Sequence, residues 1–123
     1  MQHRKRALVV EDEAELLFVW AMALNKIPEV EVVTAENGEV AFERFRAAPF
    51  DLVITDLSMP AMDGLELTRA IRQLDPEVPI IWVTAHEHFR ERMEENGLNV
   101  QAFLPKPVSV QQIREVVRYA LEL

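Results

Sequence analysis

Residues 56–64, with the sequence DLSMPAMDG, could present a reactive carboxylate at the edge of a sheet. Asp56 directly follows the apolar run at residues 52–55, and Pro60 and Gly64 prevent the chain from continuing as a straight strand. The chemistry of α/β proteins is usually found at such an edge. Asp is also a common first residue of surface turns, so this stretch taken alone leaves a plain turn open.

Four further polar side chains follow apolar runs in the same way. Glu11 and Asp12 come after the first run, Thr84 ends the fourth and Lys106 follows the fifth. Because the carboxyl ends of parallel strands meet at one edge of a sheet, we expect these four side chains to lie close to Asp56. Acids, Thr and Lys often border strands individually, so it is their joint placement that favours a functional site.

Three neighbouring carboxylates indicate a cation site. They would repel one another and raise their own pKa values unless a cation were shared among them. Mg²⁺ suits Glu11, Asp12 and Asp56, because it binds carboxylate and phosphate oxygens and keeps several waters, whereas the lack of a nearby His argues against zinc. Asp56 is then a candidate nucleophile that would accept a phosphoryl group as an acyl phosphate. Lys106 and Thr84 would help to position and neutralise that group.

Alternating apolar runs and helical patterns predict the elements that position these residues. Short apolar runs predict strands at residues 7–10, 30–34, 51–55, 79–83 and 102–104. Helical spacing predicts helices at residues 14–27, from 38 onward, at 65–74, at 86–96, and after Ser109, which is a plausible N-cap. Five strands alternating with five helices predict an α/β fold with a parallel sheet that is covered by helices on both faces.

Composition and charge narrow the function classes. A chain of 123 residues with 50% hydrophobic residues and no Cys fits one domain without disulfides, a thiolate zinc site or a Cys nucleophile. The first apolar run, residues 7–10, is too short for a signal peptide or a membrane span, so a cytoplasmic protein is expected. A net charge of −8 disfavours direct binding of nucleic acid. Proteins, or small anions bound through a metal, are the expected partners.

Five motifs, in order along the chain, resemble the receiver domain of two-component response regulators, including the chemotaxis-regulator-like ones. They are VVEDE at residues 9–13, AENGE at 35–39, DLSMPAMDG at 56–64, WVTA at 82–85 and FLPKP at 103–107. Each motif alone is weak, but five in register are highly specific. The resemblance implies that residues 1–123 form one receiver domain with no effector domain. It also implies a doubly wound, flavodoxin-like fold with five helices and a five-stranded sheet in the order 2-1-3-4-5.

The resemblance also assigns roles at the sheet edge. It implies that Asp56 is phosphorylated by a sensor histidine kinase or a phosphotransfer protein. Asp12 would bind Mg²⁺ directly and Glu11 through water, while Asp56 and the backbone carbonyl of Ser58 would supply further ligands. Lys106 would pair with the phosphoryl group, and the peptide bond that follows it is expected to be cis, because the next residue is Pro.

A switch is implied by the same resemblance. Phosphorylation would draw the Thr84 hydroxyl toward Asp56 and vacate space for the ring of Phe103. This would change a face formed by the fourth helix, fifth strand and fifth helix, through which a downstream protein, a fused effector domain or a second copy would bind. Ser58 and His86 would tune the lifetime of the phosphoryl group, although His86 is about as well explained as a solvated loop residue.

Two other functions are weighed against this phosphorylation-activated switch, which is expected to be a phosphoacceptor rather than an enzyme. A receiver-like protein-binding module without phosphorylation is disfavoured, because the acidic residues, the hydroxyl and the lysine are all present. A phosphohydrolase or nucleotide-binding enzyme would need an acid two residues after the nucleophile or a Gly-rich phosphate loop. Ser58 stands at the first of these places, and no such loop follows the first strand.

Overall fold

The computed structural model describes residues 4–57, 59, 62–85 and 99–123. Its strands are β1 (Lys5–Val10), β2 (Val30–Ala35), β3 (Leu52–Asp56), β4 (Ile80–Thr84) and β5 (Ala102–Pro105). Its helices are α1 (Ala14–Asn25), α2 (Gly38–Ala47), α3 (Gly64–Leu74) and α5 (Val110–Leu121). The helix predicted at residues 86–96 lies outside the described residues, so the helix labels pass from α3 to α5.

The five strands form one parallel sheet in the order β2-β1-β3-β4-β5. This confirms the strand number, direction and order expected from the sequence. The register pairs Val10 with Thr55 and Asp56 with Val83, so the carboxyl ends of β1, β3 and β4 meet at one edge. The order of the strands reverses between β1 and β3, which is where ligands bind in open α/β sheets.

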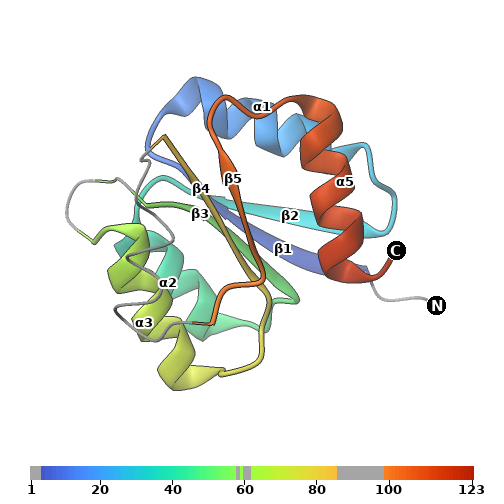
Figure 1. The fold of residues 1–123 in the computed structure, drawn as a ribbon. Helices are drawn as coiled ribbons and strands as arrows, with labels where there is room; N and C mark the ends of the chain where they lie inside the picture. The colour runs from blue at the N-terminus through green and yellow to red at the C-terminus, as the bar shows by residue number, and fades with distance from the viewer. Residues whose placement is uncertain (1–3, 58, 60–61, 86–98) are drawn as a thin grey trace.

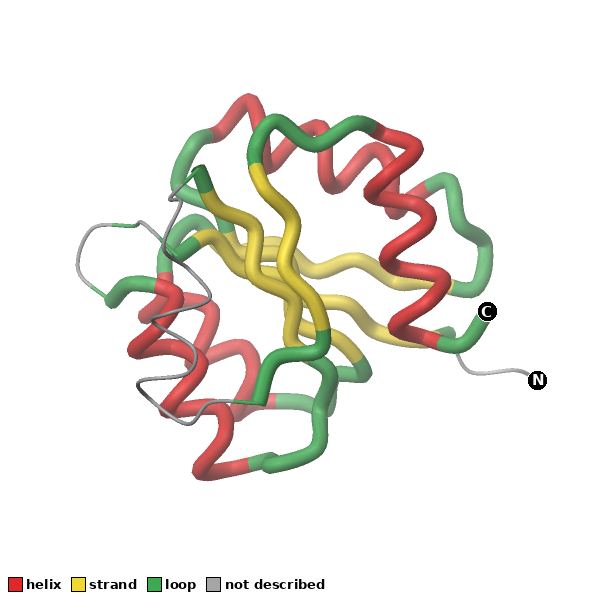
Figure 2. The backbone as a smooth tube through the Cα atoms, in the orientation of Figure 1, coloured by secondary structure: helices red, strands yellow, loops and turns green. Residues whose placement is uncertain are grey.

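Helices cover the sheet on both faces, α1 and α5 on one and α2 and α3 on the other (Figures 1 and 2). The side chains of a strand alternate between the two layers, as the pleat of a strand requires. In β1, Ala7 and Val9 pack under α1 and α5, whereas Leu8 and Val10 pack under α2 and α3. β3 and β4 are buried along their whole length, which explains why their sequences are apolar up to the polar residue at the end.

Side-chain caps fix where three helices begin. Asn37 accepts a hydrogen bond from the backbone N–H of Val40 at 2.8 Å at the start of α2, and Asp63 does the same for Glu66 at 2.9 Å at the start of α3. Ser109 caps α5 as predicted, in a reciprocal capping box with Gln112. The caps of α2 and α3 set the exits of the two loops that flank the carboxylate edge.

Two element boundaries differ from the predicted ones by two residues, and the others differ by at most one. β1 begins at Lys5 rather than at residue 7, because backbone pairing with β2 starts at Lys5 and Val30, and Arg6 forms an ion pair with Glu31 at 2.7 Å. α1 ends at Asn25 rather than at residue 27. No helix among the described residues is both long and apolar enough to cross a bilayer.

Candidate functional site

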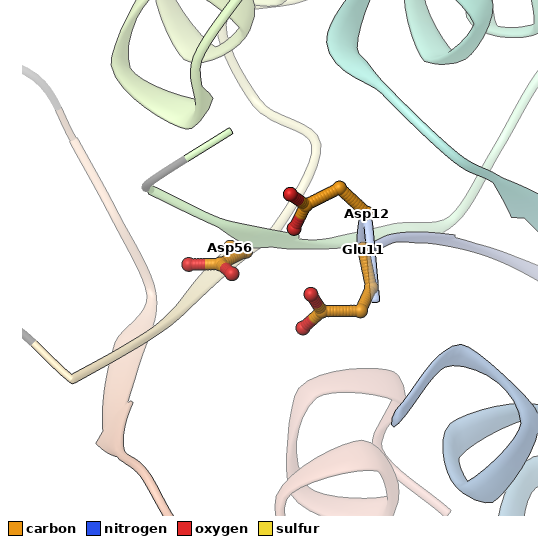
Figure 3. Close-up of side chains that lie close together, drawn as sticks. All are labelled: Glu11, Asp12 and Asp56. Carbon is orange, nitrogen blue, oxygen red and sulfur yellow. The ribbon is translucent and has the colours of Figure 1, made fainter. Parts of the chain in front are cut away.

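Three carboxylates meet where β1 and β3 end. Glu11 and Asp12 follow β1 and Asp56 is the last residue of β3. One oxygen from each side chain lies within 4.8 Å of the other two, and all three carboxyl groups point into the same space (Figure 3). The predicted convergence of these three residues is therefore found in the structure.

The three acids differ in exposure. The side chains of Glu11 and Asp56 are 3% and 5% exposed, whereas Asp12 is exposed. Glu11 is held inward because its backbone N–H donates to the carbonyl oxygen of Ala35 at 3.1 Å, and its Oε2 accepts from the backbone N–H of Glu13 at 3.1 Å. Two of the three acids are therefore buried, and the third faces solvent.

Lys106 places an ammonium group between the two buried acids. Its Nζ donates to Asp56 Oδ2 at 2.8 Å and to Glu11 Oε1 at 3.1 Å. Its own backbone N–H donates to the carbonyl oxygen of Thr84 at 2.9 Å, and the Lys106–Pro107 peptide bond is cis, as predicted. The side chain of Lys106 is 18% exposed, so the ion pairs are shielded from solvent on most sides.

Burial and charge shift two pKa values at this edge. Burial raises the pKa of Glu11 to about 7 and the charge of Asp56 adds to the rise, while the N–H of Glu13 and Lys106 oppose it. Burial alone would lower the pKa of Lys106, but its hydrogen bonds and charge interactions with Asp56 and Glu11 outweigh that effect and raise it. Lys106 is therefore firmly cationic at neutral pH, and Glu11 can exchange its proton there.

The predicted switch residues lie on neighbouring strands. Thr84 is fully buried at the end of β4, one position beyond the residue that pairs with Asp56. Phe103 is partly buried in β5 and packs against the core under α2 and α3. Ser58 and His86, which were predicted to tune the phosphoryl group, lie outside the described residues, and so does the Ser58 carbonyl predicted as a metal ligand.

The donor set fits a hard divalent cation. The three converging groups are all carboxylates, which are the ligands that Mg²⁺ prefers, and the exposed Asp12 leaves room for water or a phosphate oxygen. When Glu11 and Asp56 are both ionised, these two acids and Lys106 together carry one negative charge. We infer that Glu11, Asp12 and Asp56 are the residues that would hold Mg²⁺.

The sequence reasoning missed two contacts of the Asp56 backbone and one hydrogen bond in the core. The Thr55 hydroxyl donates to the Asp56 carbonyl oxygen at 2.8 Å, and Gly64 lies so close to that same oxygen that a Cβ at this position would overlap it. Trp82 Nε1 donates to the hydroxyl of Thr68 at 2.9 Å inside the core. The hydrogen bond of Trp82 could have been anticipated, because a Trp in a wholly apolar strand is buried and its indole N–H needs an acceptor.

Comparison with known proteins gives a consistent family. A family model described as "Response regulator receiver domain" matches residues 7–118. The response regulator protein PilR of Pseudomonas aeruginosa is 32% identical over 120 residues, which cover 98% of this chain and 27% of PilR. The sensor histidine kinase GacS of Pseudomonas protegens is 36% identical over 118 residues, which cover 91% of this chain and 13% of GacS. The chain thus spans about a quarter or less of these two relatives.

Solved structures give the same result for the fold. The response regulator protein TrrA of Thermotoga maritima, in complex with Mg²⁺-BeF, is 33% identical with a TM-score of 0.83, covering 95% of this chain and 99% of that one. The chemotaxis protein CheY4 of Vibrio cholerae is 25% identical with a TM-score of 0.87, covering 96% and 99%.

Proposed function

Because the chain belongs to the response regulator receiver domains of two-component signalling, we propose that it is a phosphorylation-activated switch whose phosphoacceptor is Asp56. The observation that carries this proposal is the buried Asp56 carboxylate, paired with the Lys106 ammonium at 2.8 Å and placed beside Glu11 and Asp12. An acid held this way can attack phosphorus, and its neighbours can neutralise the charge that arrives with the phosphoryl group.

The transfer is a displacement at phosphorus. An Asp56 carboxylate oxygen forms the new P–O bond while the P–N bond of a phosphohistidine breaks, and the imidazole leaves with the electron pair of that bond. Bound Mg²⁺ would supply charge neutralisation on the phosphoryl oxygens. Lys106 is already in contact with Asp56 and would follow the phosphoryl oxygens, and the Thr84 hydroxyl would donate to one of them. The chain is proposed as a phosphoacceptor that assists its own phosphorylation and dephosphorylation, rather than as an enzyme for a second substrate.

The partners follow from the family. Receiver domains interact with histidine kinases and effector domains, and the relatives include a response regulator and a sensor histidine kinase. We propose a sensor histidine kinase or phosphotransfer protein as the phosphodonor. We propose that the output surface is formed by β5, α5 and the helix predicted at residues 86–96, which lies outside the described residues. A downstream protein, a fused effector domain or a second copy of the chain would bind there.

Intact mass after incubation with acetyl phosphate tests the proposal. We expect a gain of one phosphoryl group that requires Mg²⁺ and is absent in Asp56→Asn. Asp51→Asn is the matched control, because Asp51 is an exposed acid that precedes the same strand and accepts a hydrogen bond from the Arg6 backbone, which Asn can still do. Phosphorylation that persists in Asp56→Asn would place the acceptor elsewhere, and no gain in the wild type would favour a protein-binding module.

A further inference from the structure

A buried hydrogen-bond chain joins β4 to the first turn of α3. Trp82 Nε1 donates to Thr68 Oγ1 at 2.9 Å, and the Thr68 hydroxyl donates to the carbonyl oxygen of Gly64 at 2.7 Å. The side chains of Trp82 and Thr68 are fully buried. Because a hydroxyl has one proton, its donation to Gly64 leaves it as the acceptor for the indole, so the two bonds depend on each other.

One end of this chain lies against the backbone of the proposed phosphoacceptor. Gly64 is the first residue of α3, and its N–H donates to the carbonyl oxygen of Leu57 at 3.1 Å. A Cβ at Gly64 would overlap the Asp56 carbonyl oxygen and would lie 2.8 Å from the Cα of Leu57. With no free space between them, a displacement of the Asp56 backbone must displace the first turn of α3.

The other end lies beside the aromatic switch residue. Trp82 pairs with Phe103 in the parallel register of β4 and β5, and paired residues of neighbouring strands point to the same face of a sheet. Both side chains pack into the core under α2 and α3. Trp82 also precedes Thr84 by two positions, so these two side chains share a face as well. The orientation of the indole therefore sets part of the space that is open to Phe103.

We propose that Thr68 and Trp82 form a positioning relay, in which the Thr68 hydroxyl couples the backbone around Asp56 to the indole of Trp82 and thereby to the packing of Phe103. The inference rests on the proposed function, because a phosphoryl group on Asp56 is the event that the relay would report. It adds a second connection to Phe103, beside the one expected through Thr84. Neither Thr68 nor Trp82 contacts the phosphoryl group in this scheme.

A simpler account is that Thr68 satisfies a buried indole N–H and nothing more. The two accounts differ in what phosphorylation does to Trp82. If Thr68 serves stability alone, its loss weakens the fold and leaves the response of Trp82 to phosphorylation unchanged. If it serves as a relay, its loss uncouples that response, and Ser, which keeps the hydroxyl, restores it.

The test follows the indole ¹H–¹⁵N signal of Trp82 before and after Mg²⁺ with beryllofluoride, with the signal assigned by its loss in Trp82→Phe. Thr68→Val removes the hydroxyl at nearly constant volume, and Thr68→Ser keeps it. Ile71→Val is the matched control, because Ile71 is a fully buried residue of the same helix that lies in the same core cluster. Intact mass after acetyl phosphate measures phosphorylation of each variant separately.

We expect the Trp82 signal to shift in the wild type, Thr68→Ser and Ile71→Val, and the shift to fall by about threefold or more in Thr68→Val, as for coupled neighbours. A full shift in Thr68→Val, or an equal loss in Ile71→Val, overturns the relay. Phosphorylation of the wild type with no shift of Trp82 overturns the relay alone. A wild type that takes no phosphoryl group overturns the proposed function and the relay together.

Discussion

Glu11 and Asp56 are two acids buried against the ammonium group of Lys106. Nζ of Lys106 contacts both carboxylates, at 3.1 Å and 2.8 Å. The pKa of Glu11 rises to about 7, chiefly through burial, and the charge of Asp56 adds to the rise while Lys106 opposes it. We therefore expect Glu11 to exchange its proton for a metal ion that binds at this edge.

Stability without metal should fall as pH rises through the range in which Glu11 ionises. Below about 4.5 the carboxyl is protonated in the unfolded and the folded chain, and up to about 7 the folded chain alone keeps the proton. The folded state binds more protons in this window, so the free energy of unfolding decreases with pH, by about 3 kcal/mol in all from this group.

Urea unfolding of the wild type and Glu11→Gln in EDTA, from pH 4.5 to 8, measures this loss. We expect the wild type to lose stability relative to Glu11→Gln across the range. Glu43→Gln, which neutralises an exposed acid of α2, should keep the wild-type profile. Parallel profiles for the wild type and Glu11→Gln would show that Glu11 is already ionised in the folded chain at low pH.

Removal of the ammonium should expose the repulsion between the acids. Lys106→Met removes the ammonium group that contacts both Glu11 and Asp56, and breaking a buried pair in this way costs about 3 kcal/mol or more. The loss should be larger at pH 8 than at pH 5, because protonation of Glu11 relieves it, and Mg²⁺ should recover part of it at pH 8. Urea unfolding at the two pH values checks this, and an equal loss at both would contradict it.

The sequence was sufficient to predict that the site residues lie close together, but not to predict which of them are buried. Glu11, Asp12, Asp56, Thr84 and Lys106 were predicted to converge because each follows an apolar run, and the strand ends do meet at one edge. That Glu11 is buried while Asp12 is exposed depends on the packing of neighbouring loops, which no local pattern specifies. Contacts between residues that are distant in the sequence, such as Trp82 with Thr68, escaped prediction for the same reason.

At the scale of elements, apolar runs located every strand and helical spacing located every helix that the structure describes, but the ends of these elements were less well predicted. A run of apolar residues marks the part of a strand that is buried, whereas pairing can continue into charged residues. β1 begins two positions before its apolar run because Lys5 and Arg6 pair with β2. Caps are local and were easier to predict, as Ser109 shows.

Hydrogen bonds from Arg72 connect the end of α3 to the segment that precedes β5. Its guanidinium donates to the Asn99 carbonyl oxygen from Nε at 3.1 Å and from one terminal nitrogen at 2.6 Å. Its other terminal nitrogen donates to the carbonyl oxygens of Val78 at 2.7 Å and Asp75 at 3.2 Å. Burial lowers the pKa of Arg72 while Asp75 opposes the change, so these hydrogen bonds form at some cost in desolvation.

A lysine side chain cannot form the same hydrogen bonds as the planar guanidinium group of Arg72. We expect Arg72→Lys to destabilise the fold by about 1–2 kcal/mol, since at least two of these hydrogen bonds are lost. We also expect faster hydrogen exchange at the Gln101 amide, which donates to the Ile80 carbonyl oxygen at 2.8 Å where β5 begins. Arg46→Lys, an exposed replacement in α2, should change neither quantity. Unchanged exchange at Gln101 in Arg72→Lys would show that Asn99 is held by other contacts.

At the scale of the molecule, we expect cation binding at the acidic edge to be linked to folding. The chain has 21 acidic and 13 basic residues and a net charge of −8, so any cation gains from the long-range field. A specific site differs from this general attraction, because the three carboxylates converge only in the folded chain. A cation that binds there stabilises the folded state according to its concentration relative to Kd, whereas a cation attracted by net charge stabilises the fold little.

Magnesium should therefore raise the melting temperature with the logarithm of its concentration above Kd, by an amount equivalent to about 1.4 kcal/mol at ten times Kd. The gain should be larger at pH 8 than at pH 5.5, because protonation of Glu11, whose pKa is about 7, competes with the cation. Asp12→Asn should abolish most of the gain, and Glu43→Gln should keep it although it removes the same charge. Thermal unfolding across a Mg²⁺ titration measures each case. A gain that persists in Asp12→Asn would assign the effect to net charge and leave the carboxylates as a site for Lys106 alone.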